Sequence, residues 1–193
     1  MFRFPSRLGD RCRYPAMSRG GMNWKPIKQT ALPKTKLTLL RKIYSSGINA
    51  RELRRELKPV TDPVLLHYVA WLSAETLTWH DVGFDWPKSV LMHPKCDAGT
   101  AIMIYWLGNP EYAYSVDPDD WQRPNQRDLK RIENAYLGEK YKSQKISFDP
   151  TTFLPDPKKR QIIARMPYGM TLPSKGRTLK PLRVENAGGY YIF

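Results

Sequence analysis

The side chains of this sequence that could bind a metal ion lie between residues 67 and 97. They are three evenly spaced histidines, one cysteine and three aspartates: His67, His80, His93, Cys96, Asp81, Asp85 and Asp97. His93 and Cys96 are separated by two residues and form one half of a zinc-like site. A structural zinc ion needs four ligands, which usually come as two such pairs. Because no second pair exists, we expect no metal and no cofactor, and we interpret His67 as a core histidine.

Enzyme chemistry would require a different arrangement of these groups. Asp81 and Asp85 stand among aromatic residues, which can raise the pKa of a carboxyl group and create a general acid. The same residues suit a helix cap or a binding loop, and we favour capping, then binding, then catalysis. No serine stands in a nucleophile elbow, and no glycine-rich phosphate loop is present. The sequence therefore predicts no catalytic residue.

Charge is distributed unevenly along the chain. Residues 1–60 hold 15 Lys and Arg against 3 Asp and Glu, a net charge of +12. Residues 61–125 hold 3 against 9, a net charge of −6, and residues 126–193 hold 14 against 6, a net charge of +8. This pattern indicates a surface for an acidic partner, either protein or nucleic acid. Alternatively, the basic arms fold back on the acidic centre and the remaining charge serves solubility.

Two predicted helices carry the candidate partner-binding residues. One runs from Ala50 to Leu57 after an Asn49 cap, and the other begins after an Asn125 cap and ends near Tyr141. Opposite their apolar stripes lie the candidates Arg51, Arg54, Arg55, Arg127, Lys130, Arg131 and Asn134. Residues three and four apart are neighbours on a helix, so each set forms one patch. Alternatively, both patches are ordinary solvent-exposed helix faces. The first helix could also belong to a helical hairpin that either binds DNA or only packs against the rest of the protein.

The remaining elements predict a mainly α fold. Apolar spacing predicts a helix over 35–44, and start signals at Asp62-Pro63, Trp86-Pro87 and Asp97 predict helices over 63–72, 88–92 and 98–107. The helix after Asp62 is apolar nearly all round and should be central. The sequence also predicts a loop over 76–84 and a short strand over 146–148.

We therefore expect a compact multi-helix domain over 34–141, compatible with helical-repeat packing. A basic, partly disordered arm over 1–33 should precede it, and a Pro-rich basic extension over 142–193 should pack on it. No apolar run is long enough to span a membrane, and no secretory signal is visible. Cys12 and Cys96 do not make a disulfide framework, so we expect both reduced and the protein cytoplasmic.

One segment resembles a known family. Residues 93–106 read His-Pro-Lys-Cys-Asp-Ala-Gly-Thr-Ala-Ile-Met-Ile-Tyr-Trp, with Leu-His-Tyr-Val-Ala at 66–70 and Pro-Glu-Tyr at 110–112. This pattern resembles the bacterial domain of unknown function 4274 over about residues 62–120. The resemblance implies a helical fold and no known activity. Structural roles alone would also explain these residues: Asp97 would cap a helix, Gly99 would permit the close approach of another helix, and the Thr100 hydroxyl would hydrogen-bond back along its own helix.

Small orphan bacterial domains of this kind resemble immunity proteins, which act by binding. We therefore expect a non-catalytic, stoichiometric interaction protein, an immunity-type protein that neutralises a cognate bacterial toxin with an acidic surface. The alternative is a basic nucleic-acid-binding accessory protein, and an enzyme ranks third.

Overall fold

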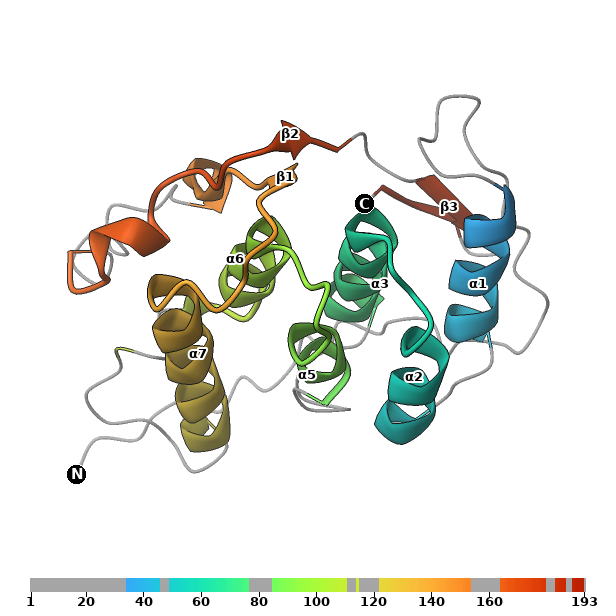
Figure 1. The fold of residues 1–193 in the computed structure, drawn as a ribbon, viewed down its shortest axis with the longest axis horizontal. Helices are drawn as coiled ribbons and strands as arrows, with labels where there is room; N and C mark the ends of the chain where they lie inside the picture. The colour runs from blue at the N-terminus through green and yellow to red at the C-terminus, as the bar shows by residue number, and fades with distance from the viewer. Residues whose placement is uncertain are drawn as a thin grey trace, which may run out of the picture.

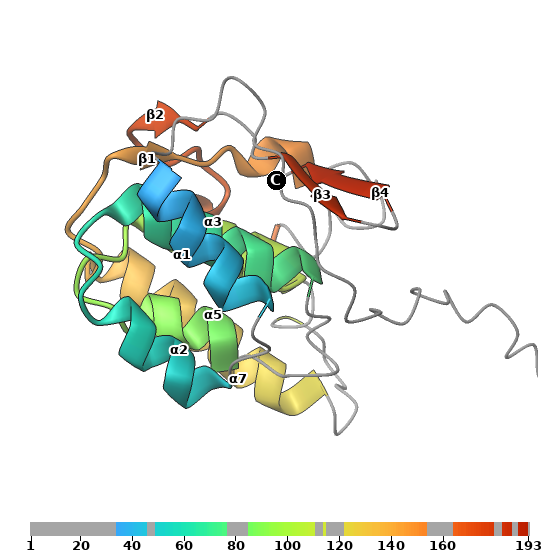
Figure 2. The same ribbon diagram turned by 90° about the vertical axis from the view of Figure 1, so that its right-hand side faces the viewer.

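Six α-helices in the described part of the chain form three successive pairs. The computed structural model describes residues 34–45, 49–76, 85–110, 114, 122–153, 164–179, 183–186 and 189–192. The first helices of the pairs are α1 (Lys34–Ser45), α3 (Pro63–Thr76) and α6 (Ala98–Leu107), and the second helices are α2 (Ala50–Leu57), α5 (Asp85–Leu91) and α7 (Gln122–Leu137). Figures 1 and 2 show the first helices side by side in one row and the second helices in another. The predicted mainly α fold is confirmed.

Side-chain caps start these helices where the sequence predicts them. The Asn49 side chain accepts hydrogen bonds from the backbone N–H groups of Arg51 and Glu52, each at 3.0 Å, and Glu52 Oε2 accepts the Asn49 N–H at 3.0 Å. This capping box satisfies amides that have no partner inside α2. Asp62 Oδ1 accepts the Val64 N–H at 3.0 Å at the start of α3. The predicted caps of both helices are therefore confirmed.

The core lies between the two rows, with α3 and α6 at its centre. These two helices pack against each other, and α3 also contacts α1 and α5, while α6 also contacts α7. Both are buried nearly all round, as their composition predicts; fully buried side chains include Leu66, Val69, Ile102, Met103 and Ile104. Among the second helices, α2 and α7 are amphipathic, and α2 buries only Leu53 and Leu57, whereas α5 buries five of its seven residues.

The bounds of three helices differ from the prediction by three residues or more at one end or both, and α5 spans Asp85–Leu91 where the sequence predicts 88–92. Helix α7 begins at Gln122, so Asn125 lies inside it and is not its cap. Pro124 is tolerated there because the first turn of a helix has no internal partner for its N–H groups. The helix ends at Leu137, before Tyr141, because Glu139 takes a left-handed φ of 53° and the Lys140 N–H bonds to the Ala135 carbonyl at 2.9 Å. Helix α3 continues to Thr76, and the predicted loop, with His80 and Asp81, otherwise lies outside the described residues.

The described parts of the C-terminal extension include segments that contact α6 and α7. Strand β1 (Ile146–Ser147) pairs in parallel with β2 (Arg177–Thr178), and β3 (Arg183–Asn186) forms an antiparallel hairpin with β4 (Gly189–Ile192). Two short 3₁₀-helices, η2 (Pro150–Phe153) and η3 (Tyr168–Met170), lie between β1 and β2, and both β1 and η2 contact α6 (Figure 1). The predicted strand at 146–148 is thus confirmed. The basic arm over 1–33 lies outside the described residues.

Each helix in the described part of the chain is too short or too polar to cross a lipid bilayer.

Candidate functional site

The most distinctive sequence motif is buried and holds the fold together. Asp97 is fully buried, and its Oδ1 accepts the N–H of Gly99 at 2.9 Å and that of Ile146 at 3.3 Å. Its Oδ2 accepts the N–H of Lys145 at 2.8 Å and the hydroxyl of Ser143 at 2.5 Å. The predicted cap on α6 is confirmed. The same carboxylate also ties residues 143–146 to that helix, a role that no local pattern indicates.

Gly99 and Thr100 make long-range contacts that differ from the predicted ones. A Cβ atom on Gly99 would lie 2.1 Å from the Ile146 carbonyl oxygen, so the element that approaches closely is strand β1 and not another helix. Thr100 Oγ1 lies 3.0 Å from His67 Nδ1 and links α6 to α3, where the sequence predicts a bond along its own helix. These residues therefore serve packing.

The two described histidines are also structural. His67 is 2% exposed, as predicted for a core histidine, and burial lowers its pKa to about 3. Since the unfolded state binds a proton on this ring near pH 6.5, acid favours unfolding. His93 Nε2 donates to the Leu57 carbonyl at 3.1 Å, and its Nδ1 accepts the Lys95 N–H at 3.1 Å, so both nitrogens are engaged.

The other metal-capable side chains that the structure describes are not grouped into a metal site. Burial raises the pKa of the Cys96 thiol, which is 3% exposed and therefore unreactive. In the part of the chain that the structure describes, no three His, Cys, Asp or Glu side chains are grouped so that they could hold a metal ion. His80 and Asp81 are outside that part.

A buried polar cluster, missed by the sequence analysis, joins α6 to α7 around Glu133. Glu133 Oε2 accepts the hydroxyl of Tyr105 at 3.0 Å and that of Tyr114, and its Oε1 accepts the Lys130 ammonium at 3.1 Å. The Lys130 Nζ also lies 3.6 Å from the centroid of the Tyr114 ring. Burial raises the pKa of Tyr105 and of Tyr114, so both hydroxyls stay protonated donors. The signal in the sequence is that Glu133 stands four residues after the buried Leu129.

Lys130 accordingly differs from the other candidate residues on α7. Its ammonium group is committed to the Glu133 cluster, although the side chain remains partly exposed. Arg127 and Asn134 are exposed, and Arg131 is exposed and donates to Asp128 at 2.9 Å. Three of the four candidate residues on α7 are therefore exposed to solvent, while Lys130 is engaged in the cluster.

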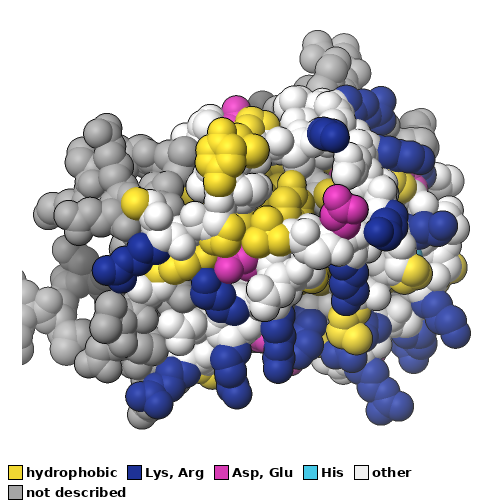
Figure 3. All heavy atoms as spheres, turned by 60° about the vertical axis from the view of Figure 1, so that its left-hand side comes forward, with side chains coloured by type: hydrophobic (Ala, Val, Ile, Leu, Met, Phe, Trp, Pro, Cys, Tyr) yellow, Lys and Arg dark blue, Asp and Glu magenta, His cyan; other side chains and the backbone are white. Residues whose placement is uncertain are grey.

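The structure brings the predicted α2 and α7 patches onto the same row of helices. Arg51, Arg54 and Arg55 are exposed on α2, and Arg54 Nε lies 3.3 Å from Ser89 Oγ on α5. Helix α5 lies between α2 and α7 (Figure 1) and adds Lys88. We call the resulting surface the basic band, which consists of Arg51, Arg54, Arg55, Lys88, Arg127 and Arg131. Figure 3 shows many Lys and Arg side chains and few Asp and Glu on one face of the molecule.

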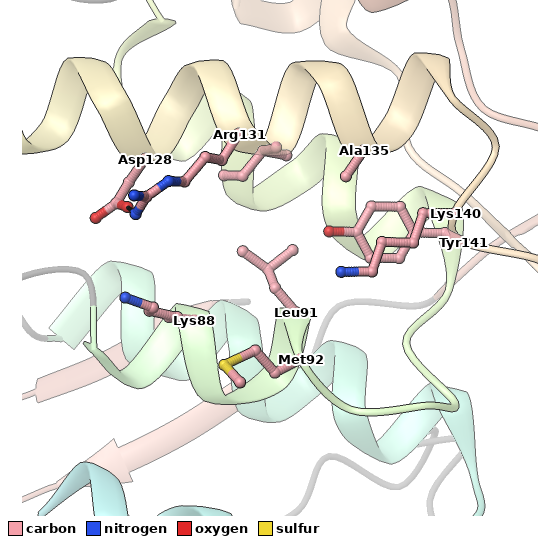
Figure 4. Close-up of a pocket in the computed structure, with 9 residues that line it drawn as sticks. Lys88, Leu91, Met92, Asp128, Arg131, Ala135, Lys140 and Tyr141 are labelled. Carbon is pink, nitrogen blue, oxygen red and sulfur yellow. Dashed lines mark hydrogen bonds and ion pairs between the residues drawn. The ribbon is translucent and has the colours of Figure 1, made fainter.

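Two hollows lie beside the carboxyl end of α7. The first, of about 150 Å³, lies between α5 and α7 (Figure 4), and the second, of about 280 Å³, lies between α7 and the segment 169–175. Large apolar side chains are exposed here: Met92 (60%) lines the first hollow, Leu137 (43%) and Leu172 (40%) line the second, and Tyr168 (76%) precedes Gly169 of the second in the chain. The hydrophobic atoms in the middle of Figure 3 interrupt the basic surface. Sequence reasoning missed this feature because none of these four side chains belongs to a predicted stripe.

The family comparison covers the centre of the fold. A family model described as a domain of unknown function (DUF4274) matches residues 62–137. The resemblance to this family that the sequence predicts is confirmed over these residues. The DUF4274 segment contains α3, α5, α6 and α7 and so extends past the predicted limit near residue 120, while α1, α2 and the C-terminal extension lie outside it. No curated protein and no solved structure matches the chain.

Proposed function

We propose that this protein is a non-catalytic binding protein of the immunity type, which neutralises a bacterial toxin by stoichiometric binding of an acidic protein surface. The observation that carries the proposal is the basic band on α2, α5 and α7. Among the described residues, the groups with the most strongly shifted pKa values, by contrast, are buried: His67, Cys96, Tyr105 and Tyr141. The charged groups of the band are therefore better placed to meet a partner than these buried groups.

The geometry of the band supports a direct contact with carboxylates. Arg127 and Arg131 are exposed and one helical turn apart on α7, so a single partner surface can reach both. A guanidinium group can donate two parallel hydrogen bonds to one carboxylate, which makes arginine suited to this role. The band is also carried by helices, and a regular element holds side chains in place better than coil.

The exposed apolar side chains favour a protein partner over a nucleic acid. Protein interfaces have an apolar core surrounded by a polar rim, and a few buried anchors supply most of the binding energy. Met92 and Leu137 are exposed beside the charged surface and provide such apolar area. Nucleic-acid binding relies mainly on cations that contact phosphates, which the band alone could supply. Nucleic acid is therefore the second candidate.

Coexpression with the product of a neighbouring gene tests the proposal. We expect that product to arrest bacterial growth, the full chain to restore it, and light scattering to find a 1:1 complex. Reversing Arg127 and Arg131 to Glu should weaken the complex at least tenfold, which is about 1.4 kcal/mol. The matched control reverses Lys175 and Arg177, two exposed cations at β2 that lie outside the band, and should leave the complex intact. A neighbouring product that neither arrests growth nor binds would contradict the proposal.

A salt titration with mixed-sequence DNA and RNA decides between the two candidates. For nucleic acid, the logarithm of the affinity should fall steeply with the logarithm of the salt concentration, by about 0.9 per phosphate contact on duplex DNA. Binding that is micromolar or tighter at physiological salt, with such a slope, would replace the immunity-type proposal by the nucleic-acid one.

A further inference from the structure

The hollow between α5 and α7 has an apolar floor of fixed shape. Figure 4 shows Leu91 of α5 rising toward α7, with Ala135 and the Tyr141 ring on the opposite side. Leu91 and Ile132 are buried in the core, so the floor exists before any partner binds. Preorganised contacts add to affinity because little ordering is needed on binding. Met92, which is exposed at the same hollow, adds an adaptable apolar side chain.

The volume of the hollow matches one aromatic side chain. It measures about 150 Å³. An apolar cavity on the order of 150 Å³ holds a benzene molecule. A phenylalanine ring therefore fits, whereas a whole helix or strand does not.

The rim of the hollow is positively charged. Lys88 and Arg131 lie toward one end and Lys140 toward the other (Figure 4). The one carboxylate among the lining residues, Asp128, is bonded to Arg131. Within the described residues neither Lys88 nor Lys140 has an acidic partner within ion-pair distance. The hollow thus combines an apolar floor with a cationic rim.

We propose that this hollow anchors an acidic segment of the partner protein, with one phenylalanine side chain in the hollow and carboxylates on both sides of it. The carboxylates pair with Lys88 and Arg131 at one end and with Lys140 at the other. This inference rests on the proposed function and specifies the chemistry of the partner. The ring supplies apolar contact, and the flanking charges set the position and direction of the segment.

Two labelled nonapeptides of alternating Asp and Glu test the inference, one with a central Phe and one with a central Ser. Their charge is equal, so a difference in affinity measures the ring alone. Fluorescence anisotropy with the full chain should find the Phe peptide bound at least tenfold more tightly. Ala135→Trp, which fills the hollow, should reduce the affinity for the Phe peptide to that for the Ser peptide. Thr35→Trp on α1, an exposed position in the other row, should keep the preference.

The possible outcomes separate this inference from the proposed function. If both peptides bind equally and Ala135→Trp has no effect, the hollow is not the anchor, although the basic band still binds acidic protein. If neither peptide binds, this inference is wrong, and the coexpression experiment decides the proposed function separately. A single-stranded oligothymidine that binds more tightly than the Phe peptide, and is lost in Ala135→Trp, would assign the hollow to nucleic acid.

A second pair of substitutions tests the rim, in case Ala135→Trp does not fold. Reversing Lys88 and Lys140 to Glu changes two side chains outside the buried core and should weaken both peptides at least tenfold. The Lys175→Glu and Arg177→Glu control should weaken neither by more than twofold. Equal losses in the two double variants would show that only net charge matters and would overturn the inference.

Discussion

Replacing Asp97 with alanine should loosen the C-terminal extension from the helical domain. The carboxylate is fully buried and accepts three backbone N–H groups, from Gly99, Lys145 and Ile146, together with the Ser143 hydroxyl. Alanine removes all four acceptor contacts and leaves the amides without a substitute in the protein. The perturbation therefore acts at both the start of α6 and the start of β1.

The expected loss of folding stability can be estimated from these contacts. Removal of a helix N-cap costs about 1 kcal/mol. A buried amide left unpaired costs about 1–3 kcal/mol. The lower end applies to Lys145, an exposed residue whose amide water can reach after a small opening, and to Ile146, whose bond to Asp97 Oδ1 is long at 3.3 Å. Asp97→Ala should thus reduce the free energy of unfolding by about 3 kcal/mol. Asp97→Asn keeps Oδ1 but places an NH₂ group toward the Lys145 N–H. This variant should therefore reduce the free energy of unfolding by about half as much as Asp97→Ala.

Urea denaturation followed by circular dichroism measures these losses. Amide hydrogen exchange should quicken most at Lys145 and Ile146 in Asp97→Ala, which locates the effect. Asp149→Ala provides the control: Asp149 accepts the Thr151 N–H at 2.9 Å in an exposed setting, so its loss should stay below about 1 kcal/mol. If Asp97→Ala cost no more than Asp149→Ala, the argument that Asp97 ties β1 to α6 would be wrong.

Two further predictions concern the buried polar groups. Burial lowers the pKa of His67 in the folded state to about 3, whereas its pKa in the unfolded state is about 6.5. The folded state therefore loses stability as the pH falls below 6.5. Between pH 6.5 and 4.5, His67 should reduce the free energy of unfolding by about 2 kcal/mol. Urea titrations at both pH values should show that His67→Leu, which cannot titrate, lacks this loss, and an unchanged loss would contradict the burial argument. Glu133→Ala should reduce the free energy of unfolding by about 3 kcal/mol, because it leaves Lys130 and two tyrosine hydroxyls without their acceptor. Tyr105→Phe, which removes a single donor, should cost about 1 kcal/mol, and equal losses in the two variants would rule out a shared cluster.

Local features of the fold could be predicted from the sequence because neighbouring residues determine them. The cap side chains of Asn49, Asp62 and Asp97 accept hydrogen bonds from backbone N–H groups two or three residues ahead. Their residue types therefore predict where each helix begins. The apolar composition of α3 and α6 predicts burial on all sides, whatever packs around them. The exposed arginines of α2 likewise follow from the burial of Leu53 and Leu57 on its opposite face.

The location of the candidate site depended on the tertiary structure. Periodicity shows that α2 and α7 each have a basic face, but not that α5 lies between them in one row. From the sequence, Glu133 would be taken for a surface residue. In the structure it accepts a hydrogen bond from Tyr105, 28 positions away, and it pairs with Lys130, which removes Lys130 from the predicted patch. The hollow needs Leu91 and Ala135 on facing helices. Contacts between distant parts of a chain leave no regular spacing in the sequence, so only the packed helices could reveal them.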